Sequence, residues 1–291
     1  MNSSWIKRFL TAAIGASMLF VVLRTEYWGS RFLVMVWTLA IAFEWRKIRE
    51  EVVKTGTSPF DRFRGSECAS WLIIVGTACF HPTYFELLSI LIPMLVLAFH
   101  MRSLSQMKSR KDVNSILRNA VMSLIFDIFG FIYIPCCISY FVRLSDESLL
   151  ITMFWASFQC DTGALLAGRA FGRHRVVEFV SPGKTWEGYV GGFCLSAFSV
   201  FCLFLIRPYI QEYGFGDAVP STLSLSDFLV LDFVTVLGTI LGDLLESLLK
   251  RVARIKDSGS LLPGHGGALD RADALLLTAP LFYYVSKILL Q

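Results

Sequence analysis

The chain has 291 residues, of which 55% are hydrophobic and 17% are charged. A soluble domain usually carries about 25% charged residues and about 45–50% apolar residues. One water-soluble core cannot bury this much apolar surface, so the composition excludes an ordinary soluble enzyme and indicates a membrane protein. The net charge of +4 is too small to indicate nucleic acid as a partner.

Apolar stretches recur along the chain and are separated by short polar joints. A membrane crossing needs about 20 residues, and backbone groups in lipid must bond internally, so each stretch is expected to be a helix. We predict an all-α fold, a polytopic integral membrane helical bundle of about nine transmembrane helices. The predicted spans are 6–23, 30–45, 67–80, 84–101, 119–142, 149–168, 187–206, 226–249 and 272–290.

Basic residues are concentrated in alternate joints. With the joints assigned alternately to two sides, 22 of the 27 Lys and Arg residues lie on one side. The positive-inside rule then places the N-terminus in the cytoplasm. Lys7 and Arg8 before the first apolar run also fit a signal peptide, but cleavage would disturb this alternation, so an uncleaved helix is favoured. We expect a multi-pass protein of a bacterial inner membrane, with an organellar membrane as the alternative.

The two halves of the chain differ in their polar residues. Residues 1–150 are predicted to be a scaffold of transmembrane helices that makes lipid or dimer contacts, and their basic joints are interpreted as topology signals. Residues 151–291 are predicted to be the catalytic region, because acids lie inside their apolar spans. For Asp127 and Asp232, which have no motif around them, structural pairing is the favoured interpretation.

Polar residues form one stripe on the predicted helix 226–249. Asp243, Glu246, Ser247, Lys250 and Arg251 are spaced i, i+3, i+4, i+7 and i+8, which places them on one helical face. A salt bridge from Glu246 to Lys250 would explain two of these residues. It would not explain Asp243 and Ser247 beside them, so the stripe indicates a functional site.

The next segment joins glycines to acids. Pro263 and the glycines of Gly264-His265-Gly266-Gly267 permit close backbone approach to a ligand. Asp270 and Asp273 are three residues apart and share a helical face, although Asp270 also fits a helix cap. Converging carboxylates at 243, 270 and 273 would suit Mg²⁺. His265 is interpreted as a hydrogen-bonding loop residue rather than a metal ligand.

A second polar joint precedes the span 187–206. Lys184 and the hydroxyls of Ser181 and Thr185 can bind phosphate oxygens where the next helix begins. The GKT sequence is not a P-loop, because Val177 stands at the first glycine position of that motif. Carboxylates for a divalent cation, several cations and a glycine-rich turn together indicate phosphoryl or nucleotidyl transfer, with a lipid phosphate as the acceptor.

These motifs resemble those of the phosphatidate cytidylyltransferases, also called CDP-diacylglycerol synthases. The resemblance covers about residues 155–290. Two departures are Leu165, where the family often has an aromatic residue, and Gly183, where it commonly has a second lysine. The matching residues are Ser247, Lys250-Arg251, Lys256-Asp257, Pro263-Gly264-His265-Gly266-Gly267, Asp270-Arg271-Ala272-Asp273, Asp161-Thr162-Gly163-Ala164 and Ser181-Pro182-Gly183-Lys184-Thr185-Trp186-Glu187-Gly188.

The resemblance implies that CTP and phosphatidate react to give CDP-diacylglycerol and pyrophosphate. It implies Mg²⁺ at Asp243, Asp270 and Asp273, with the presence of a second cation left open. The implied catalytic residues are Asp243, Asp270, Lys250, Arg251, Lys256, Asp257, His265 and Arg271. The implied substrate-binding residues are Asp161, Ser181, Lys184, Thr185, Glu187, Ser247, Gly264, Gly266 and Gly267. The expected partners are these substrates and membrane lipids, with a homodimer as one expected assembly.

Three alternatives remain open from the sequence. The chain can be a cytidylyltransferase for an ether-linked archaeal lipid, or a CTP-dependent lipid or polyprenol kinase that releases CDP. It can also be a transporter or lipid-binding scaffold, which would show flux or binding without turnover.

Overall fold

The computed structural model describes residues 27–53, 66–105, 113–144, 147–213, 219–261 and 266–291. Within these ranges every regular element is a helix, and an isolated bridge pairs Arg175 with Thr185. The predicted all-α class is therefore confirmed for the part of the chain described. The first predicted span, 6–23, lies outside the described residues.

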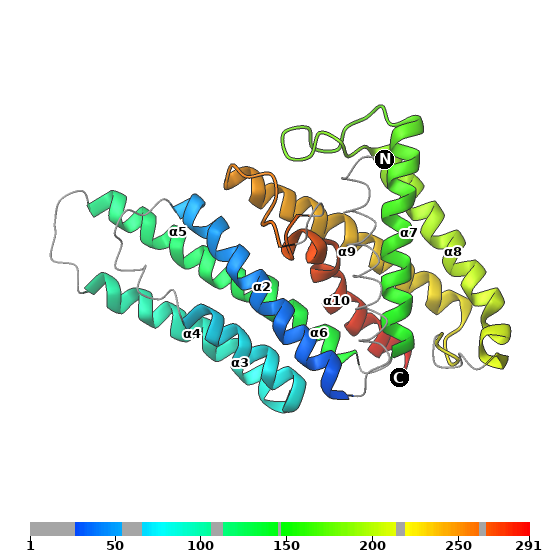
Figure 1. Ribbon diagram of the computed structural model, residues 1–291, viewed down its shortest axis with the longest axis horizontal. Helices are drawn as coiled ribbons and strands as arrows, with labels where there is room; N and C mark the ends of the chain where they lie inside the picture. Colours follow the sequence, from blue (N-terminus) through cyan, green and yellow to red (C-terminus); the bar gives the residue numbers. More distant parts are fainter. Residues whose placement is uncertain (1–26, 54–65, 106–112, 145–146, 214–218, 262–265) are drawn as a thin grey trace. The chain divides into compact units, whose positions relative to one another are not determined.

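Figure 1 shows the helices coloured along the chain. Each of the other eight predicted spans overlaps a helix, and the span 119–142 covers three consecutive elements. The elements are α2 (Tyr27–Val53), α3 (Ser66–Phe80), α4 (Pro82–Ser105), α5 (Val113–Phe131), η2 (Ile132–Cys136), α6 (Cys137–Arg143), α7 (Glu147–Phe171), α8 (Trp186–Glu212), α9 (Leu225–Val252) and α10 (Leu269–Leu289).

Six helical stretches among the described residues are long and apolar enough to cross a membrane. They are Tyr84–Arg102, Ile116–Arg143, Ser148–Phe171, Trp186–Glu212, Leu225–Val252 and Leu269–Leu289. Large apolar side chains also point outward from them: Phe158 is 75% exposed and Leu95 is 67% exposed. Such surface is costly in water, at about 25 cal/mol per Å², and costs little in lipid. The chain is a multi-pass membrane protein.

Helix α2 is longer than the span 30–45 that the sequence predicts. It continues to Val53 through residues that the sequence assigns to a polar joint. The continuation is explained by burial, because Trp45, Ile48 and Arg49 are 1%, 0% and 4% exposed. An arginine can be buried in a helix when its charge is paired, so the basic residues here do not end the helix.

The described helices group into two compact units. One unit contains residues up to Arg143 together with Val252–Arg271, and the other contains Leu144–Arg251 together with Ala272–Gln291. The first therefore takes in α2 to α6 and the segment that links α9 to α10. Each unit is described below by itself.

In the first unit, α2 packs on α3 and α5, and α3 packs on α4. Trp45 of α2 lies against the rings of Phe126, Phe129 and Tyr133, with ring centroids 5.9, 5.8 and 6.5 Å away. Arg49 donates to both oxygens of Asp127, one of them at 3.0 Å. The structural pairing expected for Asp127 is confirmed, and it fixes the rotation of α2 against α5.

In the second unit, α7 and α8 lie side by side, as Figure 1 also shows. Small residues permit this contact: a Cβ at Gly163 would lie 2.6 Å from the carbonyl oxygen of Gly191, and one at Gly191 would collide with Ala167. The hydroxyls of Ser157 on α7 and Thr239 on α9 are 2.9 Å apart, which joins α9 to this pair.

Candidate functional site

The residues after α7 form a closed turn that returns to the start of α8. Val176 N–H donates to the carbonyl of Lys184 (3.1 Å), and Trp186 N–H donates to the carbonyl of His174 (2.9 Å). Thr185 is the N-cap of α8, and its hydroxyl accepts the N–H of Gly188 at 3.1 Å. This turn holds Lys184 in a defined position next to a helix N-terminus.

Glu187 braces the same turn from the first turn of α8. Its carboxylate accepts the backbone N–H groups of Arg173 (3.1 Å) and His174 (3.2 Å), and it also contacts the ring nitrogen Nδ1 of His174. Thr185 and Glu187, two of the residues predicted to bind substrate, thus have structural partners within the turn. Ser181 lies in the turn too, where its carbonyl accepts the N–H of Lys184.

Lys184 forms an ion pair with Asp243 of α9, across 59 residues of sequence. Burial opposes the charge on this lysine, but the adjacent carboxylate of Asp243 outweighs burial, and the pKa of Lys184 is raised above its usual value. Asp161 on α7 adds to this effect. The structure therefore brings together one predicted phosphate-binding cation and one predicted metal ligand.

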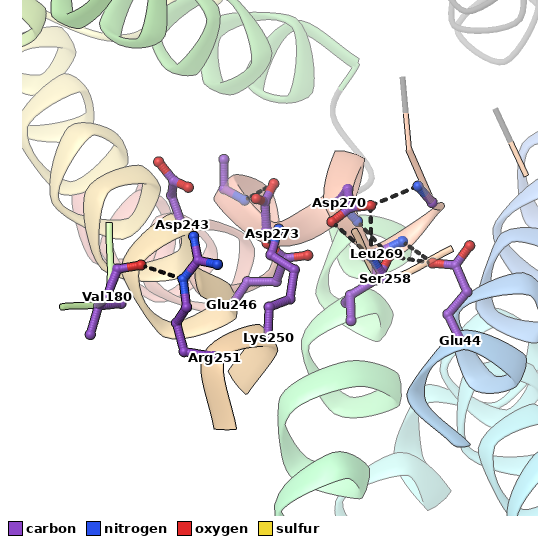
Figure 2. Close-up of polar contacts among 12 residues, drawn as sticks. Glu44, Val180, Asp243, Glu246, Lys250, Arg251, Ser258, Leu269, Asp270 and Asp273 are labelled. Atoms are coloured by element: carbon purple, nitrogen blue, oxygen red, sulfur yellow. Dashed lines mark hydrogen bonds and ion pairs between the residues drawn. The ribbon is translucent and has the colours of Figure 1, made fainter. Parts of the chain in front are cut away.

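The polar stripe on α9 is present as the spacing predicts. Lys250 pairs with Glu246, whose side chain is fully buried, so the salt bridge considered from the sequence is confirmed. Arg251 Nε donates to the carbonyl of Val180 at 3.0 Å, as Figure 2 shows, and thereby ties the end of α9 to the turn that carries Lys184. Ser247 is half-buried between these residues.

Helices α9 and α10 approach closely at the level of Asp243. A Cβ at Gly242 would lie 3.1 Å from the carbonyl carbon of Asp273 and 3.4 Å from Cα of Ala274. Asp243 and Asp273 consequently lie on neighbouring turns of two packed helices. Asp273 Oδ1 also accepts the N–H of Ala274 at 2.8 Å.

Asp270 organises the segment before α10. Its Oδ2 accepts the N–H of Ser258 at 3.0 Å and that of Gly267 at 2.7 Å. Gly266 has a φ of +83°, a conformation that favours glycine, and a Cβ there would lie 2.6 Å from Asp270 Oδ2. Both donors precede Leu269, the first residue of α10, so these hydrogen bonds hold the segment that leads into the helix.

Glu44 of α2 binds this same segment, and sequence reasoning missed it. Its carboxylate accepts the N–H groups of Ala268 and Leu269, both at 2.9 Å, and the hydroxyl of Ser258 at 2.7 Å (Figure 2). A signal was present, because Glu44 is an acid inside the predicted apolar span 30–45. An ionisable residue in a membrane span indicates a function or a partner.

The other predicted residues fall into two groups. Lys256, Asp257 and Arg271 are exposed at the surface of the first unit. Gly264 and His265 lie outside the described residues.

Carboxylate oxygens are the atoms of this region that could bind a metal. Among the described residues, no group of three or more His, Cys, Asp or Glu side chains is arranged as a metal site. Mg²⁺, however, is usually held by one or two carboxylates together with substrate phosphates and water. Asp243 and Asp273, on the packed turns of α9 and α10, each offer one carboxylate toward that smaller requirement.

The chain resembles known proteins over part of their length. It is 38% identical over 136 residues to the phosphatidate cytidylyltransferase of Haemophilus influenzae, which is 47% of this chain and 44% of the relative. The Rickettsia bellii enzyme of that name is 33% identical over 174 residues, 58% of this chain and 72% of the relative. The Bacillus subtilis enzyme of that name is 36% identical over 170 residues, which is 55% of this chain and 59% of the relative.

The chain thus spans about half the length of some of these relatives and more of others. The match to a whole family is more extensive, because it runs over residues 6–289. A match of this extent includes the turn that carries Lys184, the stripe on α9 and the start of α10. The chain belongs to the cytidylyltransferase family.

Proposed function

We propose that the chain transfers the CMP moiety of CTP to phosphatidate, which forms CDP-diacylglycerol and pyrophosphate for phospholipid synthesis. The observation that carries this proposal is the ion pair of Lys184 with Asp243, which joins the two most specific motifs of the chain. The printed names of the similar proteins agree with it. The exposed apolar helices place the protein in a membrane, where a lipid substrate is also dissolved.

The proposed reaction needs positioning more than proton transfer. An oxygen of the phosphatidate phosphate attacks the α-phosphorus of CTP, a new P–O bond forms, and the bond to the β-phosphate breaks. Phosphatidate is already anionic, so no strong general base is required. The task of the protein is to align two anions and neutralise their charge, which the cations Lys184, Lys250 and Arg251 would do. Lys256 and Arg271 are proposed to bind phosphates as well.

Asp243 and Asp273 are the proposed Mg²⁺ ligands. Asp270, one turn before Asp273 on α10, is a further proposed ligand, although its oxygens also accept the N–H groups of Ser258 and Gly267. Bound Mg²⁺ would neutralise phosphate charge at the reacting phosphorus. Lys184 pairs with Asp243 and keeps that carboxylate in place.

We propose nine membrane crossings with the N-terminus and the site in the cytoplasm of a bacterial cell. The contact of Arg251 with Val180 supports this topology, because it joins two basic joints that must then share one side. Single cysteines labelled by a membrane-impermeant reagent in intact cells test it. Labelling of Glu178→Cys or Arg254→Cys without cell lysis would contradict a cytoplasmic location.

Labelled CTP tests the reaction and separates it from its alternatives. The purified protein in detergent is mixed with Mg²⁺, phosphatidate and CTP that carries its label on either the α- or the γ-phosphate. We expect the α-label alone to enter the lipid, with one pyrophosphate per CDP-diacylglycerol. Entry of the γ-label with release of CDP would identify a kinase instead.

Two further arms complete this experiment. An ether-linked isoprenoid phosphate offered in place of diacyl phosphatidate tests the archaeal type of substrate, and we expect the diacyl lipid to react faster. Binding of lipid without any labelled product would favour the transporter or scaffold. The mass of the active particle tests whether the protein forms the homodimer that is one expected assembly.

A further inference from the structure

Glu44 lies where an unpaired acid would be costly. It is on α2, among the apolar residues of a predicted span, and is only 5% exposed. Its carboxylate accepts three hydrogen bonds: from Ser258 Oγ and from the N–H groups of Ala268 and Leu269. Leu269 is the first residue of α10 and Ala268 comes directly before it, and N–H groups at this end have no partner within the helix. Glu44 therefore caps α10 from a helix more than 200 residues earlier.

The segment is shaped to receive this carboxylate. A Cβ at Gly267 would collide with Glu44 Oε2 and with Ser258 Oγ, and one at Gly259 would lie 2.7 Å from Glu44 Cδ. Side chains at either position would push the carboxylate away. Glu44 thus gives two glycines of the chain a structural explanation.

Ser258 transmits the position of Glu44 to Asp270. The Ser258 hydroxyl donates to Glu44, while the Ser258 N–H donates to Asp270 at 3.0 and 3.2 Å. Glu44 therefore binds the side chain of Ser258, and Asp270 binds its backbone. A shift of Glu44 would move the peptide that orients Asp270.

Helix α2 is itself anchored one turn beyond Glu44. Arg49 binds Asp127 and also donates to Ser123 Oγ at 2.6 Å, while His100 Nε2 lies 3.1 Å from Asp127. With Trp45 packed among aromatic rings, α2 has little freedom to rotate or slide. The carboxylate of Glu44 is therefore presented at a fixed place.

We propose that Glu44 is a positioning residue of the cytidylyl-transfer site, which acts through Ser258 and the N-terminus of α10 to hold Asp270 and Arg271. This inference rests on the proposed function. It gives the first half of the chain a part in catalysis, in addition to its scaffold role. A misplacement of about 1 Å at a reacting centre can cost about 10²-fold in rate.

Glu44→Gln tests the proposal, because glutamine keeps the size but presents an amide N–H₂ to hydrogen-bond donors. We expect kcat to fall about 10²-fold, by analogy with other misplaced catalytic groups. The Mg²⁺ concentration for half-maximal rate should rise, while KM for phosphatidate should stay unchanged. Glu51→Gln, an exposed acid on the same helix, is the matched control and should behave as the unaltered protein.

A double-variant cycle distinguishes positioning from general loss of structure. If Glu44 acts through Asp270, Glu44→Gln combined with Asp270→Asn should lose no more activity than Asp270→Asn alone. A purely structural role would reduce the amount of folded protein and leave the Mg²⁺ requirement of the remainder unchanged. Multiplying losses, or an unchanged Mg²⁺ requirement, would overturn the proposal.

Ser258→Ala keeps the test decisive if Glu44→Gln does not assemble in the membrane. It removes one hydroxyl from the relay, and the same rise in Mg²⁺ requirement is expected. Wild-type Mg²⁺ dependence in Ser258→Ala would refute the relay. Absence of turnover in the unaltered protein would instead refute the proposed function, so the two failures are distinguishable.

Discussion

Lys184 and Asp243 show how one ion pair joins two motifs of the candidate site. They come from separate motifs, and each neutralises the other at the edge of an apolar bundle. The sequence predicts both as site residues because of their motifs. It does not predict their pairing, because pairing depends on how α8 and α9 pack.

Replacing Lys184 by Ala should lower the rate of cytidylyl transfer by about 10²–10³-fold, the cost of removing one preorganised charge that faces a developing anion. Lys287→Ala, at the exposed end of α10, should leave the rate unchanged. Initial rates with equal amounts of folded protein provide the measurement. Equal rates for both variants would remove Lys184 from the site.

Arg49 and Arg46 give a matched pair of variants on α2. Arg49→Ala would remove the guanidinium that pairs with the buried Asp127, which should cost about 3–5 kcal/mol. Arg46 pairs with Glu50 at the surface, so Arg46→Ala should cost at most about 1 kcal/mol. Thermal unfolding in detergent compares the two, and similar midpoints would show that the buried pair is not required.

At the scale of elements, hydrophobic length predicts where most helices lie, because only a helix satisfies its backbone in lipid. Hydrophobic length does not predict the bounds of a helix where polar residues are buried because they are paired. The extension of α2 to Val53 depends on Asp127, and the π-helical turn η2 contains Pro135, which lacks a backbone N–H. The sequence does not predict the contacts of Glu44 for the same reason, because its partners lie more than 200 residues away.

The packing of α7 on α8 gives a prediction at this scale. A Cβ at Gly191 would collide with Ala167, so Gly191→Ala should force the helices apart at a cost of about 1–3 kcal/mol. Gly183→Ala is the control, because a Cβ there would meet nothing within 4 Å. The change in unfolding midpoint reports the cost. A Gly191→Ala protein as stable as the control would mean that the contact is looser than described.

At the scale of the whole molecule, the chain combines a lipid-soluble exterior with a few paired charges. The family, the all-α class and the membrane location follow from sequence features that cover long stretches. The division into two units does not, because Val252–Arg271 folds with α2 to α6 although its motif lies in the half of the sequence that is predicted to be catalytic. Only tertiary contacts such as those of Glu44 place that segment.

The most direct test compares the unaltered protein with Asp243→Asn and Asp227→Asn. All three are assayed with α-labelled CTP, phosphatidate and a series of Mg²⁺ concentrations. Asp227 is at the opposite end of α9, where it accepts from Ser224, and asparagine can keep that contact. We predict labelled CDP-diacylglycerol from the unaltered protein and from Asp227→Asn, and none from folded Asp243→Asn. Full activity of Asp243→Asn would contradict the site, and no labelled lipid from any protein would contradict the function.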